Sequence, residues 1–365
     1  MSIKYSNASK GGIAKPQVKS INKEDRAPNL VGIFCPAKQQ IILVKGEKIM
    51  FEIKKFPEFS WSFSRHKTLM DCSRKYGYEY YIAHNGWLSY GVDPLSKQAY
   101  RLKKLLNLPI LFGQITHEIA DSMVKEYLKS RYIPVENELI EKGRLMLRNA
   151  FIHSRDKKEL WYDKPNKYKM FFEMYYDGNL EKEKAKEYRE RLDIVFPNLL
   201  KSKAFQDITI RHNTMRFNQS EEFRFMVIDD VKIFVVMDLL YRDIKEGKWI
   251  IVDWKTGRES DDDRNQLALY AYYLMQQFNI GVEEIEIRNE YLLKGTQKSY
   301  TLSNTDINSM LERMKSSILY MKRYQLDILT NEPIALEEFE QTDHLKYCKS
   351  CNYKEMCNRE DNKVC

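Results

Sequence analysis

The chain has 365 residues, 43% of them hydrophobic, and carries a net charge of +8 at pH 7. This length and hydrophobic share predict a folded protein of one large or two ordinary domains and exclude a disordered chain. The positive charge is compatible with an anionic polymer as partner, and the lack of any apolar stretch of about 18 residues predicts no membrane span.

The first 59 residues divide into two segments. Residues 1–28 are polar and contain glycine, which predicts a flexible arm, and they lack the apolar core of a secretion signal. Residues 29–59 predict a short β-rich element, because the runs Gln40–Lys45 and Lys48–Ile53 flank Gly46 as the strands of a hairpin would. We therefore expect a cytoplasmic protein whose six cysteines are reduced and available to ligate a metal or cluster.

Two helical segments follow. The stretch Trp61–Tyr81 predicts a helix that Ser64 caps and that carries Cys72 at its end, where the cysteine by itself indicates a buried thiol. The charged pattern from about residue 137 to residue 200 predicts a helical insertion beside a sheet. Its charges are also typical of a solvated helix face.

A pair of carboxylates marks the most informative stretch. Val231–Leu240 and Trp249–Lys255 predict two strands separated by the turn Tyr241–Lys248, and each apolar run carries one carboxylate near its end, Asp238 and Asp253. A charge in a buried strand costs several kcal/mol unless it is paired or coordinates a metal. Two carboxylates on neighbouring strands are suitable ligands for Mg²⁺ or Mn²⁺.

Three further side chains are predicted to lie beside these carboxylates. Strand periodicity puts Lys255 on the same face as Asp253, where an ammonium can orient water and offset charge on a phosphate. A helix from about Arg264 places Gln266 and Tyr270 on one side. The alternatives are an ordinary ion pair at the strand end and, for Tyr270, a core aromatic.

The C-terminal part is predicted to contain a hairpin, a helix and a cysteine cluster. Glu284–Leu293 and Lys298–Leu302 form the expected hairpin around Gly295, and a helix is expected from about Thr305 to Leu329. The tail of residues 340–365 contains three cysteines in the spacing C-x2-C-x5-C, which need a fourth ligand to complete a zinc site or a [4Fe–4S] cluster; they are Cys348, Cys351 and Cys357. Cys365 is one candidate for that ligand, with zinc as the metal.

Together these residues resemble the PD-(D/E)xK nuclease superfamily, in the branch of the RecB-type and AddB nuclease domains and the CRISPR adaptation nucleases. The matching motifs are Asp238, Asp253-Trp254-Lys255 and Gln266-x-x-x-Tyr270, and Phe112–His117 is similar to the upstream helix histidine of that branch. The resemblance implies an α/β, restriction-endonuclease-like fold, with a mixed central sheet flanked by helices, over residues 60–365.

The resemblance also implies roles for individual residues. His117 and the backbone carbonyl of Trp254 would join Asp238 and Asp253 at the Mg²⁺ or Mn²⁺, while Lys255, Gln266 and Tyr270 would be catalytic. Cys72 would join Cys348, Cys351 and Cys357 around a [4Fe–4S] cluster.

The implied activity is metal-dependent hydrolysis of DNA, at single strands or ends. The implied settings are DNA repair or recombination, phage replication, and CRISPR or other defence. No nucleotide-binding loop of the type G-x-x-x-x-G-K-[ST] is present, so a separate helicase or a CRISPR adaptation subunit is a reasonable partner. The alternative is a scaffold subunit that keeps the fold and binds DNA without cutting it.

Overall fold

The computed structural model describes residues 39–44, 47–212, 215–217, 224–357 and 359. Contacts between residues divide the chain into two compact units, Met1–Ile53 and Lys54–Cys365. In the first unit, β1 (Gln39–Val44) and β2 (Glu47–Glu52) pair antiparallel, which confirms the predicted hairpin. The predicted arm at residues 1–28 lies outside the described residues.

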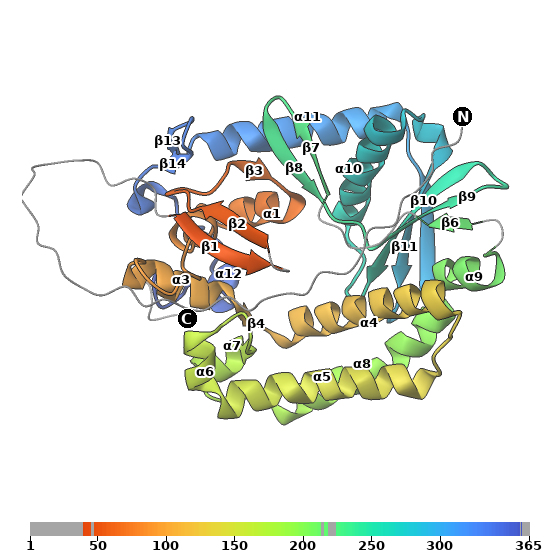
Figure 1. The fold of residues 1–365 in the computed structure, drawn as a ribbon, viewed down its shortest axis with the longest axis horizontal. Coiled ribbons are helices and arrows are strands. Elements are labelled where there is room, and N and C mark those ends of the chain that lie inside the picture. The colour runs from red at the N-terminus through yellow and green to blue at the C-terminus, as the bar shows by residue number, and fades with distance from the viewer. Residues whose placement is uncertain (1–38, 45–46, 213–214, 218–223, 358, 360–365) are drawn as a thin grey trace, which may run out of the picture. The chain divides into compact units, whose positions relative to one another are not determined.

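The second unit contains the remaining elements, shown in Figure 1. Its helices are α1 (Phe63–Asp71), α2 (Ser73–Gly77), the π-helical turn η1 (Tyr78–Ile82), α3 (Pro94–Lys103), α4 (Leu108–Ser130), α5 (Glu136–Asp156), α6 (Lys158–Asp163), α7 (Phe172–Tyr176), α8 (Lys182–Leu200), α9 (Lys203–Ile210), α10 (Asp261–Phe278), η2 (Val282–Glu284), α11 (Asn304–Lys322), η3 (Leu336–Glu338) and α12 (Leu345–Lys349). Its strands are β3 (Ser60–Trp61), β4 (Leu105–Leu106), β5 (Met170–Phe171), β6 (Met215–Phe217), β7 (Arg224–Ile228), β8 (Val231–Val235), β9 (Leu239–Asp243), β10 (Lys248–Lys255), β11 (Ile285–Tyr291), β12 (Thr296–Thr301), β13 (Gln325–Asp327) and β14 (Glu332–Pro333).

The central sheet has the strand order β12-β11-β10-β9-β6. Its β10–β11 pair is parallel and its other pairs are antiparallel, so the predicted mixed sheet is confirmed. The middle strand, β10, is buried on both faces because its side chains alternate between two apolar cores. Ile251 packs with residues of α10 and α11, whereas Ile250 and Val252 pack with residues of α4, α8 and α9. Helices therefore cover both faces of the sheet (Figure 1).

The predicted strand Val231–Leu240 is wrong, because the chain changes sheets within it. The strand β8 ends at Val235 and pairs with β7 and β3 in a separate three-stranded sheet, whereas β9 begins at Leu239 and pairs with β10. Residues 236–238 make the crossing. The predicted turn Tyr241–Lys248 also starts too early, because Tyr241 and Asp243 are buried strand residues of β9 with polar partners.

Several helix ends also differ from the prediction. The first helix is capped by Ser62 instead of Ser64, and Cys72 occupies the extended junction between α1 and α2. The last long helix ends at Lys322 rather than near Leu329, since β13 and β14 form a hairpin there. The charged stretch 137–200 is mainly helical, as predicted. Within the described residues, no helix is both long and apolar enough to span a membrane.

Candidate active site

A buried carboxylate at the end of β10 forms the centre of the candidate site. Asp253 has a side chain 9% exposed, and Lys255, two residues later on the same face, places its Nζ 2.9 Å from Asp253 Oδ2. Asn289 lies opposite Asp253 in the parallel β10–β11 register and donates from Nδ2 to the same oxygen over 3.1 Å. Two donors therefore meet one oxygen of the carboxylate.

A second carboxylate comes from the crossing segment between β8 and β9. Asp238 accepts a hydrogen bond through Oδ2 from the backbone N–H of Trp254 over 2.9 Å. Its Oδ1 lies 3.1 Å from Nδ1 of His117, in the middle of α4. One turn earlier, Gly113 faces Thr256, since a Cβ built there would lie 3.5 Å from the Thr256 Oγ1. The break after β8 thus brings Asp238 between α4 and β10.

The helix α10 holds the lysine from its other side. Asp263, near the start of α10, places Oδ1 3.4 Å from Lys255 Nζ, and its Oδ2 accepts from the Tyr291 hydroxyl over 3.2 Å. Lys255 donates to Gln266 Oε1 over 3.3 Å, and Gln266 Nε2 donates to the Tyr270 hydroxyl over 2.7 Å. Tyr270 is 5% exposed and belongs to the apolar core, so it combines a core position with a polar contact.

The charges of these groups shift one another's pKa. Burial, and then the charge of Asp238, raises the pKa of Asp253 from 3.8 to about 6, against the opposing effect of Lys255. Burial by itself would lower the pKa of Lys255, but the charges of Asp253 and Asp263 outweigh it and raise this pKa. Burial raises the pKa of Tyr270, and its neighbouring carboxylates add to that effect. The lysine is therefore an ammonium at neutral pH, and the two carboxylates repel each other.

This repulsion suits the divalent cation that the sequence pattern predicts. A cation bound to Asp238 and Asp253 would offset the charge that raises the pKa of Asp253, and carboxylate oxygens are suitable ligands for Mg²⁺ or Mn²⁺. As the side chains stand, no group of three or more His, Cys, Asp or Glu residues in the described part of the chain is placed to hold a metal ion. His117 contacts Asp238 directly, and the backbone N–H of Trp254 donates to the same carboxylate.

The structure adds two polar residues that the sequence analysis missed. Asn289 reaches Asp253 through the register of β10 and β11, and Asp263 reaches Lys255 from the start of α10. The sequence carried a signal for each residue. An asparagine is unusual in a strand as buried as β11, and Asp263 ends a run of three aspartates at a helix start.

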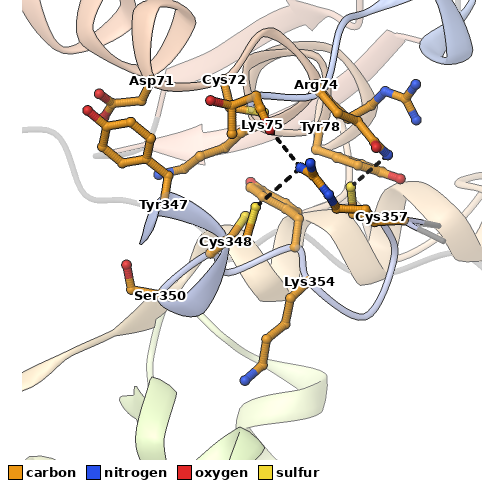
Figure 2. A pocket seen from close by; sticks show the side chains of 15 residues that line it. Asp71, Cys72, Arg74, Lys75, Tyr78, Tyr347, Cys348, Ser350, Lys354 and Cys357 are labelled. Carbon is orange, nitrogen blue, oxygen red and sulfur yellow. Dashed lines mark hydrogen bonds between the residues drawn. The ribbon is translucent and has the colours of Figure 1, made fainter. Parts of the chain in front are cut away.

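Four cysteines from separate segments line a second pocket of about 140 Å³. Cys72 comes from the junction of α1 and α2, Cys348 lies in α12, and Cys351 and Cys357 follow α12. Figure 2 shows Cys72, Cys348 and Cys357 around this pocket. All four are free thiols. Cys365 lies outside the described residues, so the structure does not test it as a ligand.

The surroundings of these thiols are partly buried and rich in hydrogen-bond donors. Burial and, to a smaller extent, the neighbouring Cys72 and Cys357 raise the pKa of Cys351 to about 11, against the opposing effects of the Tyr353 backbone and of Lys75. Gln341 Nε2 donates to Cys357 Sγ over 3.3 Å, and Arg359 Nη1 donates to Cys348 Sγ over 3.7 Å. These donors would stabilise thiolate or cluster sulfur. If these thiols ionise together, the thiolates repel one another, and a bound cation or cluster would relieve that repulsion.

The sequence of the chain was compared with those of known proteins. It matches the family model described as the PD-(D/E)XK nuclease superfamily over residues 60–358. That range contains both carboxylates, Lys255, α10 and the four cysteines of the second pocket. A search of curated proteins returned no match.

Proposed function

Because the chain belongs to the PD-(D/E)XK nuclease superfamily, we propose that it hydrolyses DNA phosphodiesters with the help of Mg²⁺ or Mn²⁺. The observation that carries this proposal is the convergence of Asp238, Asp253 and Lys255 at one edge of the central sheet. The Lys255 ammonium is 2.9 Å from Asp253, and Asp238 accepts from the backbone between them. Such a charge pattern suits a cation and a phosphate at the same place.

The metal would be held by Asp238 and Asp253, with His117 and the Trp254 carbonyl as additional ligands. A histidine among the ligands favours Mn²⁺ more than oxygen ligands alone would. Bound there, the cation would act as a Lewis acid and lower the pKa of water. The carboxylates must be ionised to bind it, so the proton that Asp253 retains below pH about 6 competes with metal binding.

Lys255 has the central role among the remaining side chains. Its ammonium would orient the attacking water and offset the negative charge that builds up on the phosphate. Gln266 fixes the position of this ammonium by accepting from it, and Tyr270 fixes Gln266 in turn. Asp263, on the same helix, also contacts the ammonium, and its charge together with that of Asp253 raises the pKa of Lys255.

The substrate we propose is single-stranded DNA or DNA ends, cut as an exonuclease would cut them. The net charge of +8 supports a polyanionic substrate. The resemblance to RecB-type and CRISPR adaptation nucleases supports a role in DNA repair or recombination, in phage replication or in defence. It also supports a separate helicase or an adaptation subunit as partner. We propose the cytoplasm as the location, since a reducing compartment would keep the four cysteines available as ligands.

Digestion of labelled DNA with Mg²⁺, with Mn²⁺ and with EDTA tests this function. End-labelled linear single strands should be degraded in either metal and remain intact in EDTA, whereas circular single strands should resist an exonuclease. Cleavage of the circles would show that the protein acts as an endonuclease instead of an exonuclease. Binding without cleavage in both metals would support the non-cleaving scaffold instead.

For the second pocket we propose a structural [4Fe–4S] cluster held by Cys72, Cys348, Cys351 and Cys357. A cluster at this place would tie the segment after α1 to the C-terminal tail, in the way that structural metal sites stabilise folds. Protein purified without oxygen should show the broad visible absorbance of such clusters. This absorbance should be lost in Cys72→Ala and kept in Cys365→Ala. Colourless protein containing zinc, or loss of the centre in Cys365→Ala, would support the zinc alternative.

A further inference from the structure

A cavity of about 600 Å³ lies outside both the active site and the cysteine pocket. It is lined by the loop of residues 86–90, by α3 and by residues 162–167 at the end of α6. None of its lining residues belongs to the four-cysteine pocket or to the constellation around Asp253. Its size is within the range of ligand pockets and would accommodate one or two nucleotides, but not a duplex.

Two aromatic side chains on the loop of this cavity are exposed. Trp87 is 45% exposed and Tyr90 is 84% exposed. The other tryptophans of the chain, all of them described, are at most 8% exposed. The loop is fixed on α3, since a Cβ on Gly86 would lie 2.3 Å from the Ser96 carbonyl oxygen and Lys97 donates to the Ser89 carbonyl over 3.3 Å. The fold therefore holds these two rings at the surface in a defined place.

Positive charge dominates the lining of the same cavity. Its cationic side chains are Lys97, Arg101, Lys164 and Lys167, whereas its acidic side chain is Asp163. The Arg101 guanidinium lies 5.3 Å from the centre of the Tyr162 ring, and its Nε donates to the Tyr162 carbonyl over 2.7 Å. Nucleic-acid bases can stack on aromatic rings and on the planar guanidinium of arginine, so Arg101 and Tyr162 form a suitable surface for a base.

The charges next to the cavity are also positive and affect one another. The Lys104 ammonium lies 5.2 Å from the centre of the Tyr100 ring, which lines the cavity. Burial lowers the pKa of Lys104, and the charge of Lys169 lowers it further. The like charges of Lys104 and Lys169 thus repel each other, and Lys104 adds positive charge next to the cavity.

We propose that this cavity is a second contact for single-stranded DNA, in which bases stack on Trp87 and Tyr90 while the four cationic side chains face phosphates. In a single strand the base faces are free to stack on protein rings, whereas in a duplex they are covered by neighbouring bases. This inference rests on the proposed action on DNA. Because the cavity lies outside the active site, the contact would hold the strand without taking part in its cleavage.

Tryptophan fluorescence of the full-length protein, titrated with a 20-nucleotide oligothymidine in EDTA, tests the contact without any cleavage. We expect quenching from Trp87, because the other tryptophans are buried. Trp87→Phe should remove the quenching, and Trp87→Ala should weaken binding by about 5- to 150-fold, the range for loss of one stacked base. Tyr132→Ala, which removes another exposed tyrosine, should change affinity less than about twofold.

The salt dependence of binding tests the phosphate contacts separately. Lys164→Ala and Lys167→Ala should each reduce the slope of log affinity against log salt by about 0.7, whereas Lys182→Ala, on the exposed surface of α8, should leave it unchanged. Equal quenching by a duplex of the same length, or unchanged affinity in Trp87→Ala, would overturn the proposal. Either result would overturn only the proposed contact at the cavity. The proposed nuclease activity is tested separately, by the degradation of a short oligonucleotide.

Discussion

Replacing Asp253 by asparagine should make the metal-free protein more stable while abolishing cleavage. The side chain is buried, and the repulsion between its charge and that of Asp238 adds to the cost of ionising it. The amide introduced by Asp253→Asn would keep the shape of the carboxyl group and remove the charge. The substitution thus distinguishes the effect of the Asp253 charge on stability from its effect on cleavage.

The size of the effect follows from the raised pKa of Asp253. Because the folded state holds this proton more tightly than the unfolded chain, the wild type loses stability as pH rises from about 4 to about 6 and the loss levels off above. With a pKa of about 6 when folded and 3.8 when unfolded, the shift lowers the free energy of unfolding by about 1 kcal/mol at pH 4.5, where the folded group is still protonated, and by about 3 kcal/mol at pH 8, where it is ionised. Asp253→Asn should gain these amounts.

Urea unfolding in EDTA at pH 4.5 and at pH 8 measures both values. Asp243→Asn is the matched control, because Asp243 is also buried but lies 2.6 Å from Arg211 and accepts from the backbone N–H of Lys245. We expect the control to lose about 1–3 kcal/mol while retaining cleavage. A variant Asp253→Asn that is less stable than the wild type at pH 8, or that still cleaves DNA, would refute the reasoning.

Three further substitutions around the lysine test its surroundings. Lys255→Ala should lower kcat by roughly 100- to 1000-fold in a protein that stays folded and keeps the cluster proposed for its cysteines, and full activity would exclude the assigned role. Tyr270→Phe removes the hydroxyl that accepts from Gln266, so kcat should fall about tenfold with KM unchanged; a change in KM alone would indicate a substrate contact. Asp263→Asn removes one of the charges that raise the pKa of Lys255, so the alkaline limb of the pH–rate profile should move to lower pH, and an unmoved limb would show that another group titrates there.

The sequence predicted a large part of the site because its strongest signals are local. The run Trp249–Lys255 is apolar except for Asp253 and Lys255, and a period of two places both on one face of a strand. The spacing of Gln266 and Tyr270 likewise predicted that they share one side of a helix, and in the structure Gln266 donates to the Tyr270 hydroxyl on α10. The break after Val235 was not predictable in this way, since the apolar run continues through it while the chain passes to another sheet.

By itself, the sequence indicated which side chains are candidates for the chemistry and which of them share a face of β10 or of α10, because periodicity is a property of neighbouring residues. Only the tertiary structure decided that α4 brings His117 to Asp238 and that β11 brings Asn289 to Asp253. Those contacts depend on how helices pack on the sheet and on the register of strands distant in the chain, and no local pattern specifies either.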